Sequence, residues 1–185
     1  LGRIIDTLSG MPFIEFITKE QLQKAGMAKT ISAGFGATKT VIPHAAGGYV
    51  YRKGKLSNMF FSLPPSLQTA AGMSSTATEM ANWIIALQNQ QFLKKQSSMI
   101  SLWAPAVLNN GKTGGFSDLL NGYAAGWPVV SRAEHPAVAP VGGGRSAVFV
   151  YPEDNLSIII LTNLSGGSPD VFIDELAGLF IPGMK

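Results

Sequence analysis

The sequence predicts an α+β fold in which an antiparallel sheet packs against helices. In the first part of the chain, apolar residues recur at helical spacing between glycine-rich loops. Near the end, residues 146–161 have the pattern of two apolar strands joined by a short turn. We therefore expect a single domain over residues 1–185, with a mainly helical and loop region at 1–121 and sheet strands plus a C-terminal helix at 122–185.

The composition is that of a well-buried globular chain. Hydrophobic residues make up 46% of the 185 residues and charged residues 14%, which excludes a disordered polypeptide. The formal net charge is +3 and no basic block is longer than Lys94-Lys95, so nothing favours binding to nucleic acid or to a membrane surface. Apolar runs such as Ile158–Leu161 are far too short to span a bilayer. Cysteine is absent, which excludes thiol chemistry and disulfides.

The N-terminal segment predicts two short helices followed by a loop. Apolar residues recur at helical spacing from the first residue to Leu8 without a capping residue before them, so we expect residues upstream of Leu1. Ser9-Gly10 ends this helix, and Pro12 suits the first turn of the next. The glycines and proline within Ala25–Ala46 indicate a loop.

The middle of the chain predicts a hairpin and two further helices. Residues 49–51 and 59–61 flank a Lys53-Gly54 turn, which favours a small β-hairpin. Thr76 and Glu79 form a capping box, so a helix begins there, and its apolar face contains Met80, Trp83, Ile84 and Leu87. A helix is expected at Gln96–Trp103, a polar loop at Asn109–Asn121 and an extended segment at Gly122–Val130.

The C-terminal segment is the best defined. Ser146–Tyr151 and Leu156–Leu161 predict two strands, joined by a turn at Pro152–Asn155. Pro169 suits the start of a closing helix. We expect four residues of this helix to pack onto the sheet: Phe172, Ile173, Leu176 and Leu179.

Five blocks, in a fixed order and covering nearly the whole chain, carry a family resemblance. They are Leu1–Pro12, Gly26–Thr30, Ala71–Thr76, Gly122–Trp127 and Gly142–Asn163. Together they resemble the class C β-lactamase, D-alanyl-D-alanine carboxypeptidase and esterase group of the serine β-lactamase and penicillin-binding-protein-like hydrolases. The resemblance implies a β-lactamase/transpeptidase-like fold that is truncated at its N-terminus. It also implies a periplasmic or secreted location, no cofactor and no bound metal.

Catalysis in the resembled family implies three motifs, two of which this chain lacks. A Ser-x-x-Lys supplies the nucleophile and its proton acceptor, and a Tyr-x-Asn assists proton transfer. Neither pattern occurs in the 185 residues, and their order in the family places both upstream of Leu1. We therefore expect residues 1–185 to be inactive, although the intact parent would transfer acyl groups from a β-lactam, a D-amino-acid peptide or an ester.

The third motif, a Lys- or His-led segment that ends in glycine, falls by order at Pro140-Val141-Gly142. Neither Pro140 nor Val141 can donate a side-chain hydrogen bond. The backbone N–H of Gly143 remains a candidate oxyanion donor, and close backbone packing is the alternative role for these glycines. Arg145 is a candidate for binding a substrate carboxylate, and a surface arginine is the alternative.

Other candidate residues are weaker. Lys112-Thr113-Gly114 is a literal Lys-Thr-Gly, but its flanks indicate a loop and it precedes the Gly122–Trp127 block instead of following it. The histidines, His44 and His135, lie in no metal-ligand spacing, and we expect His135 in an exposed loop rather than as the missing motif histidine. The acidic residues at the start of the closing helix suit the helix dipole.

Two functions remain open from the sequence. The chain is either the C-terminal part of a serine hydrolase or part of a non-catalytic relative that binds a ligand or peptide in the same place. In both cases the partner is a small molecule or a peptide. A sheet that lacks strands would also expose an edge through which the chain could self-associate.

Overall fold

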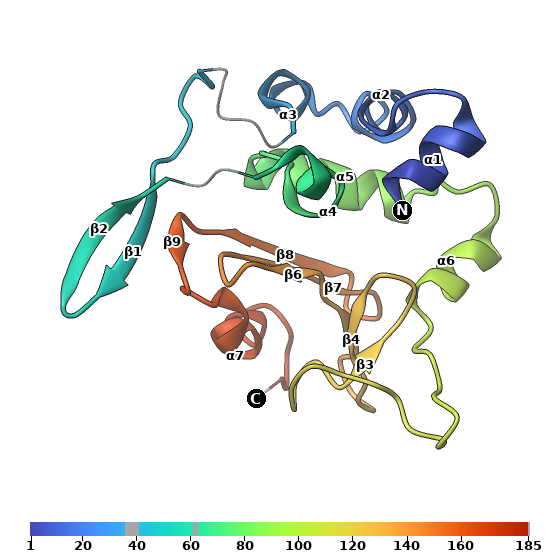
Figure 1. Cartoon of the computed structure of the whole chain (residues 1–185). Helices are drawn as coiled ribbons and strands as arrows, with labels where there is room; N and C mark the ends of the chain where they lie inside the picture. The colour runs from blue at the N-terminus through green and yellow to red at the C-terminus, as the bar shows by residue number, and fades with distance from the viewer. Residues whose placement is uncertain (36–40, 61–62, 185) are drawn as a thin grey trace. The chain divides into compact units, whose positions relative to one another are not determined.

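The computed structural model describes residues 1–35, 41–60 and 63–184. The chain divides into two compact units, Leu1–Phe92 and Leu93–Lys185, and each is described by itself (Figure 1). The first unit is mainly helical with one hairpin, and the second contains a six-stranded sheet. The expectation that residues 1–185 form a single domain stays a prediction.

The first unit begins with helix α1, Gly2–Ser9, as predicted. Gly10 ends it in the left-handed region, at φ 70°, and donates its N–H to the Asp6 carbonyl. The Asp6 carboxylate then accepts the N–H of Phe13 at 2.6 Å, and this bond caps the next helix. That helix is α2, Phe13–Ile17, which continues directly into the π-helical turn η1, Thr18–Leu22.

The prediction of a loop over Ala25–Ala46 is wrong in part, because helix α3 spans Ala28–Ala33. Met27 and Thr30, at its start, are completely buried. The Thr30 N–H and hydroxyl both donate hydrogen bonds to Glu79, which is distant in sequence. This tertiary contact stabilises a helical turn that the nearby glycines disfavour. Residues 36–40 lie outside the described part of the chain.

The predicted hairpin is confirmed over the described residues. Strand β1, Gly48–Arg52, pairs antiparallel with β2, Lys55–Met59. Its turn residues, Lys53 and Gly54, have φ of 50° and 76°, the sign that a type I′ turn requires at both positions. Phe61, which the sequence placed at the end of the second strand, lies outside the described residues.

The capping box predicted at Thr76 forms on one side only. Helix α5 spans Ala77–Gln88, and the Thr76 hydroxyl accepts the N–H of Glu79 at 3.2 Å. The Glu79 side chain, however, turns to α3 instead of returning to Thr76, because buried N–H groups there need an acceptor. Two short elements precede α5: the 3₁₀ turn η2, Pro65–Leu67, and helix α4, Gln68–Ala71.

The second unit opens with helix α6, Gln96–Trp103, as predicted. The segment Gly122–Val130 is not one extended strand but a hairpin, in which β3, Gly122–Tyr123, pairs with β4, Pro128–Val130. Gly126, at φ 85°, allows the reversal, and Ala124 donates its N–H to the Trp127 carbonyl at 2.7 Å.

The sheet of the second unit is antiparallel throughout: β3 pairs with β4 and β4 with β5, while β5 and β6 both pair with one side of β7 and β8 pairs with its other side. The two predicted strands are confirmed as β7, Ser146–Tyr151, and β8, Leu156–Leu161. The sequence did not predict three short strands: β5, Ala137–Val138, β6, Val141–Gly142, and β9, Leu164–Ser165.

The closing helix packs on the sheet through only part of the predicted face: Ile173 is buried and Leu176 packs against the core. A 3₁₀ turn, η3, covers Pro169–Phe172, and helix α7 covers Ile173–Ala177 on one face of β7 and β8 (Figure 1). Phe172 and Leu179 are 42% and 76% exposed, because the 3₁₀ turn rotates the helical face. The core contains Ile173, Ala177 and Ile181 against Phe149, Tyr151 and Ile158.

Candidate functional site

The third-motif position lies on a strand that borders β7. Val138 pairs with Val150, Val141 with Ala147 and Gly142 with Ser146, so β5 and β6 keep one register and form a single interrupted strand. Pro140 is the interruption. Its carbonyl accepts the Val148 N–H at 3.0 Å, but proline has no N–H to return. Residues 140–142 therefore border β7, and their identification as the third motif stays a prediction.

A tight glycine turn follows this strand. The Gly142 carbonyl accepts the Arg145 N–H at 3.1 Å, and Gly143 and Gly144 have φ of 58° and 60°. Positive φ at both central positions is the requirement of a type I′ turn, and residues with a side chain rarely adopt it. The two glycines are therefore needed for the turn itself.

Contacts on three sides hold the turn in place. The Gly144 carbonyl accepts the Ser168 N–H at 2.9 Å, and the Arg145 carbonyl accepts the N–H and hydroxyl of Thr162 at 2.8 and 3.0 Å. A β-carbon built on Gly144 would lie 3.4 Å from the Gly166 Cα. This distance is an ordinary van der Waals contact, so the requirement for glycine at residue 144 comes from its positive φ, and close backbone packing stays an open alternative.

The neighbouring Gly143 is different. It is exposed, and its N–H has no hydrogen-bond acceptor among the described residues. A donor that is fixed before a ligand arrives is the basic component of an oxyanion site, because it loses no orientational freedom on binding. The geometry thus leaves the Gly143 N–H available, and its role in catalysis stays a prediction.

Strand β6 also turns a peptide group outward. Pro140 faces β7 through its carbonyl, and in an antiparallel strand the direction of the peptide groups alternates from residue to residue. The N–H and carbonyl of Val141 therefore point away from β7. An extended ligand could pair with that edge by main-chain hydrogen bonds.

The candidate carboxylate ligand, Arg145, lies beside this donor. A β-carbon built on Gly143 would be 3.9 Å from the Arg145 Nε and 4.0 Å from its Nη2. The Arg145 residue is partly buried. Its guanidinium gives the turn a positive charge that Pro140 and Val141 do not supply.

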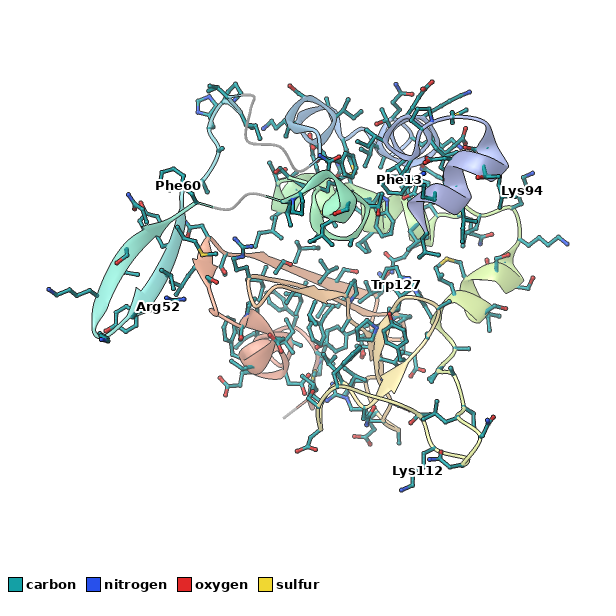
Figure 2. The ribbon with its side chains drawn as sticks, viewed as in Figure 1. Phe13, Arg52, Phe60, Lys94, Lys112 and Trp127 are labelled. Atoms are coloured by element: carbon teal, nitrogen blue, oxygen red, sulfur yellow. The ribbon has the colours of Figure 1, made fainter. Side chains whose placement is uncertain are left out.

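The literal Lys-Thr-Gly lies elsewhere, in the predicted loop. The Lys112 N–H binds the Asn110 side chain at 3.0 Å, its carbonyl accepts the Leu108 N–H at 2.8 Å, and the Thr113 hydroxyl binds the Asn121 carbonyl at 3.2 Å. Figure 2 shows Lys112 projecting from this loop rather than from the sheet. Lys112 is exposed and is not on a strand edge.

Sequence reasoning missed a polar cluster in the second unit. Arg132 binds the Asp174 carboxylate through both terminal nitrogens, at 2.7 and 3.1 Å, and the Tyr151 hydroxyl donates to the same carboxylate at 3.3 Å. His135 is half-buried, and its Nδ1 lies 2.8 Å from Asp154. The expectation of an exposed His135 is therefore wrong, although it does lie in a loop. The carboxylates gave no signal in the sequence because their partners lie 19 and 42 positions away.

This cluster also explains two pKa shifts. The hydrogen bond and charge of Asp174 raise the pKa of Arg132 despite its partial burial. Burial, with the Asp174 charge, raises the pKa of Tyr151 well above its usual value. Both shifts favour the protonated forms of Arg132 and Tyr151, which donate hydrogen bonds to Asp174 and so stabilise the fold.

Within the described residues, no group of three or more His, Asp or Glu side chains is placed to hold a metal. The same part of the chain contains no helix with the length and apolar character that a membrane crossing needs.

Comparison with known proteins fits this geometry. The sequence model of the Beta-lactamase family matches residues 1–180, which is nearly the whole chain. The chain belongs to the beta-lactamase family. Family membership confirms the resemblance inferred from the five blocks.

Relatives of this beta-lactamase-family chain include penicillin-binding proteins and an amidase. It is 25% identical over 179 residues to penicillin-binding protein 4* of Bacillus subtilis, covering 88% of this chain and 37% of that protein. A penicillin-binding protein from Bacillus halodurans matches with a TM-score of 0.76 and 24% identity, over 97% of this chain and 53% of its own. A D-amino acid amidase from Ochrobactrum anthropi matches with a TM-score of 0.66 and 19% identity, over 89% and 46% of the respective chains.

These structural matches confirm the predicted fold class, with helices packed on an antiparallel sheet of β-lactamase/transpeptidase type. The chain spans between about a third and a half of the length of these relatives. What the relatives bind or hydrolyse as whole proteins is therefore not transferred to this chain as a finding.

Proposed function

We propose that this chain supplies the carbonyl-binding side of a serine-hydrolase acyl-transfer site, and that residues 1–185 bind a ligand there without cleaving it. The observation that carries this function is the Gly143 N–H, exposed and without an acceptor on a turn fixed from three sides. Negative charge develops on a carbonyl oxygen when a nucleophile attacks, and such a donor stabilises it.

The ligand class follows from what surrounds the donor. The outward peptide group of Val141 suits the amide of an extended peptide or of a β-lactam, and Arg145 suits a carboxylate. A carboxylate-bearing D-amino-acid peptide or β-lactam meets both requirements. An ester meets only the first.

The nucleophilic step itself has no residue in this chain. Neither Ser-x-x-Lys nor Tyr-x-Asn occurs in the sequence, so the attacking hydroxyl and its proton acceptor would come from the intact parent. The corresponding prediction is that purified residues 1–185 do not turn over a chromogenic cephalosporin or a nitrophenyl ester. Serine-dependent hydrolysis by this chain would contradict it.

A second function, ligand binding without any hydrolysis in the parent, is favoured by Pro140 and Val141. Both replace side chains that would hydrogen-bond to substrate in the resembled motif. Experiments on the intact parent protein can distinguish the two functions. Turnover together with a Ser-x-x-Lys and a Tyr-x-Asn supports the hydrolase, whereas binding without turnover supports the binding module.

The site itself can be tested by amide NMR with N-acetyl-D-alanyl-D-alanine and, as a matched ligand, its C-terminal amide. We expect the free carboxylate to shift the Gly143 amide resonance. Arg145→Gln should weaken binding of the carboxylate and leave the amide ligand nearly unaffected, because only the carboxylate uses the guanidinium.

Lys112→Ala is the control for the alternative Lys-Thr-Gly. It should leave both ligands unaffected, since Lys112 is in an exposed loop away from strand β6. Loss of binding in this variant, or ligand-induced shifts confined to residues 112–114, would assign the site to the loop and reject the glycine turn.

A further inference from the structure

The chain contains two Asn-Gly dipeptides, Asn110-Gly111 and Asn121-Gly122. In such a dipeptide the glycine nitrogen can attack the side-chain amide of the asparagine, because glycine has no side chain that blocks the approach. Both asparagines are exposed, and both belong to the second unit. Exposure therefore does not distinguish the two sites, and the difference between them lies in their local geometry.

Asn110 lies in an exposed turn, next to Lys112 in Figure 2. The Leu108 carbonyl accepts the Gly111 N–H at 2.9 Å, and Gly111 has φ 77°. The Lys112 N–H donates to the Asn110 Oδ1 at 3.0 Å, which is an Asx-turn that folds the side-chain carbonyl over the peptide units that follow it. The same N–H would stabilise negative charge on Oδ1 when the Asn110 Cγ is attacked.

The Asn121 side chain is held in a different way. Its Oδ1 accepts the Ser131 N–H at 2.7 Å, and its Nδ2 donates to the Ser131 carbonyl at 3.0 Å. Both ends of the amide are therefore bound to a residue of another strand segment. These two bonds must break before the Asn121 Cγ can turn toward the next nitrogen of its own chain.

The nitrogen that would attack Asn121 is also engaged. Gly122 is buried and lies opposite Val129 in the β3–β4 pair. Because the Ala124 N–H bonds to the Trp127 carbonyl, the alternation of antiparallel pairing makes Gly122 and Val129 a hydrogen-bonded pair. The attacking nitrogen is thus fixed in a strand at this site, whereas at Gly111 it lies in an exposed turn.

We propose that Asn110 is a site of spontaneous deamidation in the folded chain and that the fold protects Asn121 from the same reaction. The Gly111 nitrogen attacks the Asn110 Cγ and loses its proton, and the bond from Cγ to Nδ2 breaks and releases ammonia. The product is a cyclic succinimide. Water, the only other reactant, then adds to one of its two carbonyls and opens the ring, which leaves either aspartate or isoaspartate at residue 110.

The products change the loop in two ways. Each carries a carboxylate where the neutral amide was, close to Lys112 in the sequence. Isoaspartate also adds a methylene carbon to the backbone, because its main chain runs through the side-chain carbon. The contacts that close this turn, from the Leu108 N–H to the Lys112 carbonyl at 2.8 Å and between Val107 and Thr113, would then lose their register.

Trypsin cleaves after lysine and arginine, so it places the two sites in different peptides, 96–112 and 113–132. The purified chain is incubated at mildly alkaline pH and physiological temperature, and samples are digested at intervals. Mass spectrometry follows the replacement of the amide NH₂ by OH in each peptide, and fragmentation locates the change. Chromatography separates the aspartate and isoaspartate forms, which have equal mass.

We expect Asn110 to deamidate at least about tenfold faster than Asn121 in the folded chain, because two side-chain hydrogen bonds and a strand pair protect Asn121. Peptide 96–112 should give two products of equal mass, since water can open the ring at either carbonyl. In guanidinium chloride, which removes the contacts of the fold, the two rates should approach each other.

Equal rates in the folded chain, or faster reaction at Asn121, would overturn the proposal. It would also be overturned if Asn110 stayed intact in the folded chain over a period that modifies it in guanidinium chloride. Asn110→Gln should abolish the modification of peptide 96–112 and leave peptide 113–132 unchanged, because the longer side chain would have to close a larger ring. Modification that persists in this variant would place the reaction at another residue. Circular dichroism establishes that the variant is folded.

Discussion

Each of the two units stabilises a shielded carboxylate, and they do so by different means. Glu79, in the first unit, is 7% exposed and belongs to no ion pair among the described residues. It accepts the Lys29 and Thr30 N–H groups at 2.9 and 2.8 Å and the Thr30 hydroxyl at 2.6 Å. Asp174, in the second unit, is less buried and binds the Arg132 guanidinium at 2.7 and 3.1 Å.

The comparison indicates which of the two contacts costs the fold more stability when it is removed. The groups around Glu79 are backbone donors at the start of α3, and the Thr30 N–H, whose hydrogen bond is buried, loses its acceptor if the carboxylate is removed. Arg132 and Asp174 keep 30% and 28% of their side-chain surface exposed, so water can replace either partner in part. We therefore expect a larger penalty in the first unit.

Glu79→Gln should have the largest effect. The amide has only one acceptor oxygen for three donors, and its NH₂ would face a buried N–H, so the free energy of unfolding should fall by about 2–4 kcal/mol. Urea unfolding followed by circular dichroism measures it. Glu15→Gln, at an exposed helical site, is the matched control and should change little. Equal effects in the two variants would contradict the buried role.

The same residue predicts acid sensitivity. Burial opposes the charge of Glu79, but the hydrogen bonds from Thr30 and Lys29 outweigh it and lower its pKa. A carboxylate with a lowered pKa in the fold contributes stability above its ordinary pKa, and this is lost as the pH falls through the folded value. The stability difference between the natural chain and Glu79→Gln should therefore narrow on acidification. A difference that is constant with pH would be inconsistent with this ionisation.

Arg132→Met should have an intermediate effect. It removes the guanidinium from Asp174 and from the His135 carbonyl, which Nε contacts at 3.0 Å, while retaining an apolar side chain of similar length. Because the pair is partly solvated, we expect a loss of about 1–2 kcal/mol in the free energy of unfolding. Arg52→Met, on the exposed hairpin, is the control, and a larger loss there would reverse the comparison.

Tyr151→Phe should have the smallest effect at neutral pH, about 0.5–1.5 kcal/mol, because it removes one hydrogen bond of 3.3 Å to Asp174. At alkaline pH the order of stability should reverse, so that Tyr151→Phe has a higher free energy of unfolding than the natural chain. The raised pKa of Tyr151 means that the unfolded chain ionises first, so the natural protein loses stability as the pH rises above the usual tyrosine value. Tyr51→Phe, at a 61% exposed site, is the matched control substitution.

How much the sequence could predict depended on how local the determining contacts are. The hairpin at Lys53-Gly54, the start of α5 at Thr76 and the pair β7–β8 all depend on residues within a few positions of one another. Helix α3 was missed, because Thr30 is fixed by Glu79, 49 positions away. Strands β5 and β6 were missed, because Pro140 and three glycines obscure the alternation that pairing with β7 imposes.

By itself the sequence determined the family, through five ordered blocks, and the absence from this chain of the nucleophile motifs, because both are properties of residue order. The third-motif position at Pro140–Gly142 stays a prediction from the order of the blocks. Only the tertiary structure decided that the Gly143 N–H has no acceptor among the described residues and that β5 and β6 pair with the same side of β7. Whether a backbone group is paired depends on which strand lies beside it in space, and no local pattern of side chains records that neighbour.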